Sequence, residues 1–273
     1  MNQHHEANRR SWDARSAEWS QRTDPTGNWQ RCHREPRLVL DERELHWLTA
    51  PVLDCRAAAP AAVVSGNGRR GACPTSGLAG QRIAVLGSGD NLVVFALAGM
   101  GAQVTSVDIS ENQLAIARHR AAELGLPVEF VRSDVTEMSA LATGQFDLVF
   151  TGGHVAIWVS DLRKFYAEAT RILRPGGRLI VSEYHPFRRV WKDNTERLEL
   201  FHDYFDRGLR SYATRCGSNH EFQWMVGDYV NAVIAAGCEV EAVEEFGTGS
   251  DGEWELAPVG GLPRVLLVVG RKR

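Results

Sequence analysis

The chain has 273 residues, of which 44% are hydrophobic, and its formal net charge is −3. This length allows a substantial buried core, and the missing positive charge argues against a nucleic-acid or anionic-membrane partner. Five widely spaced cysteines without a CxxC pair argue against a disulfide framework or a zinc site. With no signal-like start and no membrane-length apolar run, a soluble cytoplasmic protein without a metal site is expected.

The first part of the chain, residues 1–54, is polar and rich in tryptophan. Trp12 and Trp19 are seven residues apart, so a helix would place both on one face. The apolar spacing within 36–48 predicts a second helix. Residues 55–79 then change character to small residues, Pro and Gly without a period, which predicts a flexible insertion.

From residue 82 onward, apolar strand-like runs alternate with helical stretches. The predicted strands are 83–87, 103–108, 127–134, 146–152 and 177–184, and the predicted helices are 91–100, 111–124, 137–142 and 161–173. This alternation predicts a parallel sheet covered by helices on both faces. After a helix at 226–236, strands at 238–247 and 264–272 follow without room for a crossover helix, so only an antiparallel pair fits.

The segment at about 185–225 interrupts the alternation and is rich in aromatic, charged and histidine residues. We interpret it as an inserted element that faces the substrate. Its run FHDYF at 201–205 allows two readings, a wall for a planar substrate or half of an amphipathic helix, and the second is favoured. His202 and Asp203 are sequence neighbours that would not face each other on a helix, which argues against a metal pair.

The stretch from Ile83 to Asp108 has the pattern of a nucleotide-binding site: an apolar strand, a Gly-Ser-Gly turn, a helix and a second apolar strand that ends in an acid. Gly87 and Gly89 carry no side chain that would block a backbone approach to a ligand, and the following helix offers free N–H groups. Asp108 ends the second strand, where an acid can accept both ribose hydroxyls. A dinucleotide loop needs a third small residue where this chain has Leu92, so the loop alone does not decide the nucleotide.

The whole arrangement from 82 to 184 resembles a class I S-adenosylmethionine-dependent methyltransferase. The segments that carry the resemblance are VLGSGDN for the glycine loop, SVDIS for the ribose-binding acid, RSDVTE for the adenine contact, FDLVFTGG for the fourth strand and ILRPGGRLIVSEY for the turn before the fifth. The chain departs from the family at Val85, where many members have an acid that orders the loop. Asp90 or Asn91 can take over part of that task, or the backbone alone holds the loop.

The resemblance implies an α/β fold with a Rossmann-like, doubly wound sheet of seven strands, mostly parallel with an antiparallel last strand and helices on both faces. It implies S-adenosyl-L-methionine as the cofactor and methyl transfer to a nitrogen or oxygen atom of a small molecule, with specialised metabolism as the expected setting. Residues 1–54 would form a helical lid or cap, 55–79 the insertion and 80–273 the methyltransferase domain. The alternatives are a protein that binds S-adenosylmethionine without methyl transfer and, less favoured, an NAD(P) oxidoreductase; the oligomeric state stays open.

The predicted site residues follow from these motifs. The cofactor-binding residues are Gly87, Ser88, Gly89, Asn91, Asp108, Ile109, Ser133, Asp134, Val135, Thr151 and Gly152. His154 and His185 follow the fourth and fifth strands, so both can face the acceptor as a general base, although either can instead play a structural part. The predicted substrate-binding residues are Trp19, Tyr184, His202 and Tyr204.

Overall fold

The computed structural model describes residues 2–51, 77–89, 92–192, 199–215, 217–247 and 262–273. Most of the predicted insertion at 55–79, together with Asp90 and Asn91, lies outside the described residues. None of the helices within the described ranges is long and apolar enough to cross a membrane.

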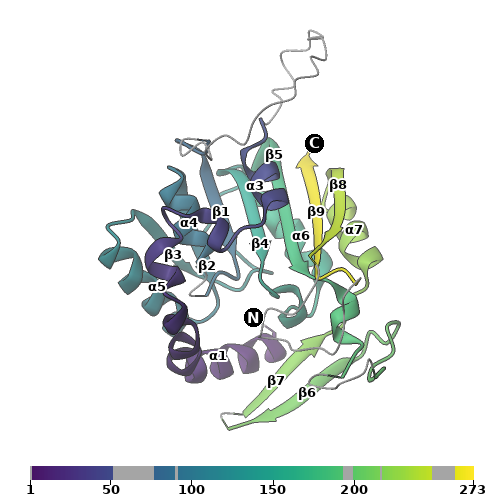
Figure 1. The fold of residues 1–273 in the computed structure, drawn as a ribbon. Helices are drawn as coiled ribbons and strands as arrows, with labels where there is room; N and C mark the ends of the chain where they lie inside the picture. Colours follow the sequence, from purple (N-terminus) through teal and green to yellow (C-terminus); the bar gives the residue numbers. More distant parts are fainter. Residues whose placement is uncertain (1, 52–76, 90–91, 193–198, 216, 248–261) are drawn as a thin grey trace.

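A seven-stranded sheet forms the centre of the molecule (Figure 1). Its strands are β1 (Arg82–Leu86), β2 (Gln103–Asp108), β3 (Val128–Arg132), β4 (Phe146–Gly152), β5 (Leu173–Tyr184), β8 (Cys238–Phe246) and β9 (Val265–Lys272). The order is β3-β2-β1-β4-β5-β9-β8, and β9 runs antiparallel to both of its neighbours. The predicted sheet, with its reversed last strand, is confirmed.

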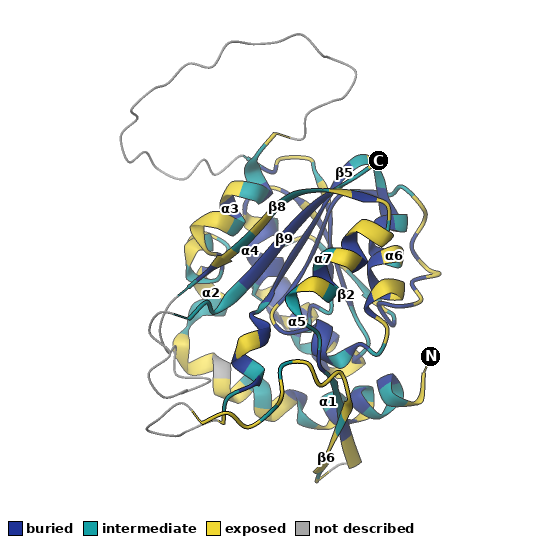
Figure 2. Ribbon diagram, turned by 90° about the vertical axis from the view of Figure 1, so that its right-hand side faces the viewer, coloured by how far each residue is buried: buried dark blue, intermediate teal, exposed yellow. Residues whose placement is uncertain are grey.

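Helices cover both faces of this sheet. The α-helices of the described residues are α1 (Gln3–Thr23), α2 (Asn28–Arg31), α3 (Glu42–Thr49), α4 (Val93–Gly99), α5 (Glu111–Glu123), α6 (Leu162–Ile172) and α7 (Val226–Ala235), and α3 to α7 supply the helices of the two faces. One buried cluster contains side chains of α6 and α7, and the other contains side chains of α3, α4 and α5. The buried strands therefore lie between two apolar layers, while the outer helix faces are exposed (Figure 2).

Local signals explain where the helices begin. Ser110 caps α5 by accepting a hydrogen bond from the backbone N–H of Gln113, as the sequence predicted. Asp161 caps α6 through the N–H of Lys164 in the same way. Both caps follow strand ends, so they point the helices back along the sheet.

Two predicted helices are wrong. At 137–142 the chain forms turns, because the Asp134 carboxylate accepts from the N–H and hydroxyl of Thr136 and closes a tight turn there. At 201–205 the chain is also non-helical, since Asp203 accepts from the N–H of Phe205 in a local side-chain turn. The segment then forms a hairpin of β6 (Leu209–Thr214) and β7 (Gly217–Phe222).

Helix α1 lies along the carboxyl edge of the sheet, next to β7 (Figure 1). Its buried residues are polar: His5, Asn8, Ser11 and Ser16. A helix buried through polar side chains is held by hydrogen bonds more than by apolar packing, and it is suited to face a polar ligand.

Hydrogen bonds fasten α1 on two sides. The Asn8 amide donates to the carbonyl of His220 at 2.8 Å and accepts from its N–H at 2.7 Å, which joins α1 to β7. The Ser110 hydroxyl donates to the Asp13 carboxylate at 2.6 Å, which joins α1 to the start of α5. The helix therefore spans from the hairpin to the second strand of the sheet.

Candidate functional site

A cavity of about 330 Å³ lies at the carboxyl ends of the central strands, under α1. We call it the glycine-loop cavity. Its lining residues come from α1 and α5, from the ends of β2 and β5 and from the segments that follow β1, β2, β3 and β4: His5, Asn8, Trp12, Trp19, Gly87, Ser88, Gly89, Leu92, Asp108, Ile109, Gln113, Asp134, Val135, Gly153, His154, Val155, Trp158, Val159 and Tyr184. This is the edge of an α/β sheet where ligands bind.

The glycine loop follows β1 and needs its glycines. Gly87 and Gly89 have φ angles of +65° and +49°, which residues with a side chain rarely adopt. A Cβ atom on Gly87 would also collide with the side chain of Val155, whereas at Gly89 the nearest contact would be an ordinary 3.6 Å. The loop therefore packs against the β4 side of the cavity and leaves its backbone open to a ligand.

Asp108 ties this loop to the next strand. One of its carboxylate oxygens accepts from the N–H of Gly89 at 2.8 Å and the other from the N–H of Ser110 at 2.8 Å. Carboxylate oxygens have further lone pairs, so these bonds leave acceptor capacity for a ligand. The residue lines the cavity, as expected for a ribose-binding acid, and it also supports the start of α5.

Other residues around Asp108 fit a nucleoside. The Gln113 side-chain oxygen is buried in the cavity wall and has no hydrogen-bond partner among the described residues. Ile109 and Val135 add apolar surface for a planar base. A buried acceptor without a partner is costly, so a ligand that donates a hydrogen bond to the Gln113 oxygen would be stabilised here.

Asp134 is held by a histidine that the sequence analysis did not identify. His5 Nδ1 lies 2.8 Å from the Asp134 carboxylate, and His5 Nε2 accepts from the N–H of Ser160 at 2.9 Å. The proton therefore lies on Nδ1, and His5 donates it to Asp134. Burial alone would raise the pKa of Asp134, but the hydrogen bonds from His5 and Thr136 lower it to about 2.

The α1 residues of the site were only partly predicted. The sequence analysis placed Trp12 and Trp19 on one face but did not extend that face to His5 and Asn8. The spacing 5, 8, 12 and 19 is that of a single helical stripe, so the signal was present. In the structure this stripe faces the cavity, with Trp12 against Trp158 at 5.5 Å between ring centroids.

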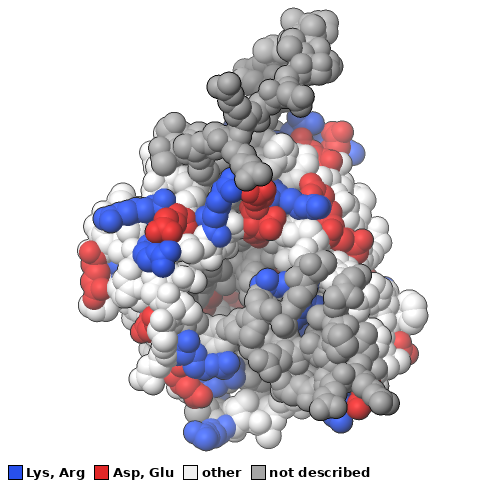
Figure 3. Space-filling model, viewed as in Figure 1, with Lys and Arg blue, Asp and Glu red and all other residues white. Residues whose placement is uncertain are grey.

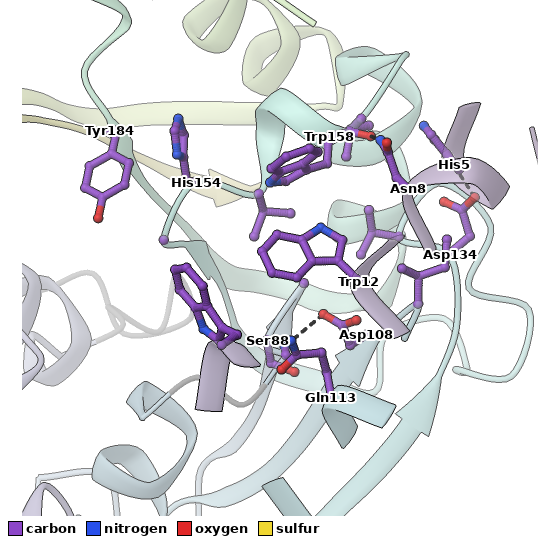
Figure 4. A pocket seen from close by; sticks show the side chains of 18 of the residues that line it. His5, Asn8, Trp12, Ser88, Asp108, Gln113, Asp134, His154, Trp158 and Tyr184 are labelled. Carbon is purple, nitrogen blue, oxygen red and sulfur yellow. Dashed lines mark hydrogen bonds and ion pairs between the residues drawn. The ribbon is translucent and has the colours of Figure 1, made fainter. Parts of the chain in front are cut away.

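A second cavity of about 650 Å³ adjoins the first. The two cavities have six lining residues in common: Trp12, Trp19, Gly153, His154, Trp158 and Tyr184. In Figure 4 Asp108 and Gln113 lie at one side of the glycine-loop cavity, His154 and Tyr184 at the opposite side, and Trp12 and Trp158 between them. The molecule is hollowed on this face, and Lys or Arg side chains border the hollow (Figure 3).

His154 stands where the cavities meet. Its φ angle is +77°, a region that few residues with a side chain adopt, and its ring packs edge-on to Tyr184 with 4.6 Å between centroids. Burial, and then the positive charges of Arg189 and Arg188, lower the pKa of His154 well below its ordinary value. The imidazole is therefore neutral near pH 7, in the form that can accept a proton.

A buried carboxyl group holds the loop that carries His154. Glu183 on β5 accepts from the N–H of Ala156 at 3.1 Å, and the N–H groups of Val155 and His154 also point to it. Burial raises the pKa of Glu183 to about 8, against the opposing effect of these N–H groups. Glu183 is thus a positioning residue for the strained turn at His154.

The geometry gives His185 a structural part. Its Nδ1 accepts from the N–H of Phe187, and its Nε2 lies 2.6 Å from the Glu245 carboxylate, so both ring nitrogens are engaged. The side chain is fully buried and lines neither cavity. The predicted role as a general base finds no support in this arrangement, because the β5 terminus turns the ring toward β8.

The remaining predicted residues divide between lining and support. His202 lines the second cavity, whereas the Tyr204 hydroxyl accepts from the N–H of Val226 and lines neither cavity. Thr151, Gly152 and Ser133 line neither of the two cavities. The sequence placed the strand ends correctly, but the turns after them decide which side chains reach the cavities.

Val85, the position where the chain departs from the family pattern, is buried in the core and only 1% exposed.

Comparison with known proteins agrees with this site. The family described as "Methyltransferase domain" matches residues 85–181. A ubiquinone biosynthesis O-methyltransferase of Aromatoleum aromaticum is 34% identical over 107 residues, which cover 39% of this chain and 45% of that protein. Another of the same name, from Thiobacillus denitrificans, is 29% identical over 136 residues, and the chain thus spans about half the length of these relatives.

Solved structures give the same result. An S-adenosylmethionine-dependent methyltransferase from Mesorhizobium loti superposes with a TM-score of 0.58 at 26% identity, covering 71% of this chain and 92% of that one. A TehB-like methyltransferase from Corynebacterium glutamicum shares the fold over 95% of this chain, with a TM-score of 0.50 at 17% identity. The fold and site define a Rossmann-like methyltransferase domain. The chain is similar in fold and in its matched domain to the class I S-adenosylmethionine-dependent methyltransferases, whose cofactor is S-adenosyl-L-methionine.

Proposed function

We propose that this chain transfers a methyl group from S-adenosyl-L-methionine to an oxygen or nitrogen atom of a small molecule. The observation that carries the proposal is the junction of the two cavities at six shared residues, His154 and Tyr184 among them. One cavity fits a nucleoside and the other adjoins it, as a reaction between two bound molecules requires. The similarity to ubiquinone biosynthesis O-methyltransferases favours oxygen as the acceptor.

The residues that would hold the cofactor are those of the glycine-loop cavity. Asp108 would accept the ribose hydroxyls, the backbone at Gly87 to Gly89 would face the amino-acid end, and Asp134 with Val135 would border the adenine. When bound, this cofactor supplies a methyl group already activated on a sulfonium. The unpartnered Gln113 oxygen and the open glycine backbone fit such a ligand.

The chain's own task is then to position the acceptor and to exclude water. Correct positioning of two reactants can lower a barrier by roughly 7–11 kcal/mol in favourable cases. Trp12, Trp19 and Trp158 supply rigid walls at the junction of the cavities. Neutral His154 can accept the proton of a hydroxyl acceptor, an effect worth about 10²–10⁴-fold in rate.

We infer that the small molecule that accepts the methyl group belongs to specialised metabolism. The second cavity is formed largely by α1 and by the segment between β5 and α7, outside the residues that match the methyltransferase domain family. A cavity built from such chain-specific parts suits a particular small molecule.

Cofactor binding is the first test. Calorimetry and thermal shift with S-adenosylmethionine, S-adenosylhomocysteine, NAD⁺ and NADP⁺ should show binding of the first two at micromolar concentration and no appreciable stabilisation by the others. Stabilisation by NAD(P) alone would refute the proposal. Release of S-adenosylhomocysteine with a panel of hydroxylated and amino-substituted small molecules then separates a methyltransferase from a protein that only binds the cofactor.

His154→Asn tests the base within the same assay. Asparagine tolerates the positive φ of this position but cannot act as a base. Turnover should fall while the affinity for S-adenosylhomocysteine stays unchanged within about twofold, since the expected loss is in proton transfer. Full turnover would mean that positioning alone suffices.

A further inference from the structure

The second cavity concentrates positive charge. Among the described residues its lining contains five basic side chains, Arg15, Arg22, Arg188, Arg189 and Lys192, and one acidic side chain, Glu221. The whole chain carries a net charge of −3, so this concentration does not reflect its composition. A concave surface with one sign of charge and low-dielectric walls attracts ligands of the opposite sign.

The cavity's own acid does not balance these charges. Glu221 pairs with Arg189, and Lys192 pairs with Glu199 at 3.3 Å outside the lining. Arg15 and Arg22 have no carboxylate partner among the residues that the structure describes. The Nε atom of Arg15 is buried without a hydrogen-bond partner. Such a donor is costly unless a ligand satisfies it.

The same cavity is rich in aromatic rings. Four of the chain's eight tryptophans line it: Trp12, Trp19, Trp158 and Trp191. Tyr184, Phe201 and Tyr212 add further rings. Rings of this size offer flat apolar surface on which a planar ligand can stack.

Aromatic rings could instead bind a cationic amine, as in an aromatic cage. Here that alternative is disfavoured, because guanidinium groups already lie over three of the rings. Arg15 lies 4.8 Å from the centroid of Trp12, and Arg22 lies 5.5 Å from that of Trp19. Arg188 lies 5.9 Å from the ring centre of Tyr184, at the junction with the glycine-loop cavity. An incoming ammonium would meet like charge at each of these places.

We propose that the second cavity selects an aromatic acceptor that carries an anionic group, a carboxylate or a phosphate, which the arginines of α1 and of the segment after β5 bind. This rests on the proposed function, since it names the substrate class of the same site. The anionic group would contact Arg15 or Arg188 while the rings stack on the tryptophans. The acceptor hydroxyl would then face His154, whose pKa is lowered by burial and then by the charges of Arg189 and Arg188.

The test uses three matched probes: 6-hydroxy-2-naphthoate, the corresponding carboxamide and the corresponding aminomethyl compound. Each is titrated calorimetrically into the full chain, with and without S-adenosylhomocysteine, at low and at high salt. The carboxylate should bind at least about tenfold more tightly than the carboxamide, and the amine should bind most weakly. The preference should shrink at high salt, because ions screen the arginines.

Arg15→Gln and Arg188→Gln are the informative variants, and Arg163→Gln, an exposed arginine on α6, is the matched control. Each informative variant should weaken the carboxylate about tenfold or more while changing the carboxamide less than about twofold. The control should change neither. Circular dichroism and S-adenosylhomocysteine affinity confirm that each variant is folded.

A carboxylate that binds no more tightly than the carboxamide, including the case in which none of the probes binds, overturns the proposal. Equal losses for both probes in Arg15→Gln and Arg188→Gln also overturn it, since they would indicate a packing effect. The proposed function fails separately, if S-adenosylhomocysteine does not bind. The titrations without S-adenosylhomocysteine report the charge preference in either case.

Discussion

The glycine-loop cavity and the second cavity are built from different kinds of parts. The first uses strand ends, backbone N–H groups and a carboxylate that bonds to backbone, with Gly89 and Asp108 only nineteen residues apart. The second joins α1, the segment after β5 and the hairpin β6–β7, and it presents side chains with charge and aromatic rings. A ligand that is common to a family can be held by backbone, whereas a particular substrate needs particular side chains. Both cavities share the turn at His154. Substitutions at this turn and in each cavity can therefore test whether the two cavities bind different ligands.

The largest expected effect is the change in unfolding free energy with pH that Glu183 causes. Glu183 supports the turn at His154, which both cavities share. Its pKa is raised to about 8 in the folded protein, against an ordinary value of 4.5. Its contribution to stability is therefore complete below about pH 4.5 and is lost as the pH rises through about 8. Between about pH 6 and pH 8, the wild type should lose about 2–3 kcal/mol of unfolding free energy relative to Glu183→Gln.

Urea unfolding of the two proteins at both pH values measures this difference. Glu18→Gln, which removes an exposed carboxylate of α1, is the control and should follow the wild type. Parallel pH profiles for wild type and Glu183→Gln would show that the buried carboxyl is ionised throughout.

Asp108 tests the cofactor side of the comparison. Hydrogen bonds to a charged group contribute about 1.5–3 kcal/mol, so Asp108→Ala should weaken S-adenosylhomocysteine binding about tenfold to a hundredfold. Calorimetry on the folded variant measures the affinity, and Arg22→Gln, which lines only the second cavity, should leave it unchanged. An affinity of Asp108→Ala within about twofold of wild type would leave Asp108 only its part in supporting α5.

The two glycines of the loop form a smaller, paired test. Gly87→Ala combines a φ of +65° with a collision at Val155, whereas Gly89→Ala has φ of +49° and ordinary contacts only. We expect destabilisation of about 2 kcal/mol for the first and about 1 kcal/mol for the second. Thermal or urea unfolding gives both values, and equal losses would mean that Val155 moves aside freely.

The smallest expected effect is the loss of folding stability that His154 causes at acid pH. Its pKa lies well below the ordinary 6.5 in the folded protein, so stability is lost as the pH falls through 6.5. Over one pH unit below that value, the wild type should lose about 1 kcal/mol more than His154→Asn. His154 thus lowers stability as the pH falls, whereas Glu183 lowers it as the pH rises. Unfolding curves at about pH 6.5 and 5.5 provide the measurement, and an identical loss in both proteins would place a protonated His154 in the folded state.

Much of the fold was predictable from sequence because the sheet's signals are local. Apolar runs, the Ser110 cap and the two-strand ending each depend on a few neighbouring residues, and they led to the parallel sheet covered by helices and to the antiparallel pair at its end. The predictions failed at 137–142 and 201–205, where short polar side chains close turns that compete with a helix.

Part of the lining of the glycine-loop cavity was likewise predictable, since Gly87, Gly89, Asp108 and Asp134 stand at strand ends that parallel pairing brings together. His154 and His185 show the limit of that reasoning. Both follow a strand of the same edge, but the chain turns at His154 with positive φ and at His185 directs the ring to Glu245. Side-chain direction after a strand depends on the turn, and the turn depends on residues packed against it.

By itself, the sequence determined the doubly wound sheet, the position of the glycine loop and the acid that supports it, because periodicity and turn chemistry act over short distances along the chain. Only the tertiary structure decided that His5 holds Asp134, that His185 is structural and that Arg15 and Arg188 border one cavity. These contacts join residues more than a hundred positions apart or depend on burial. No local pattern encodes such pairs, since they form only when the packed core brings the segments together.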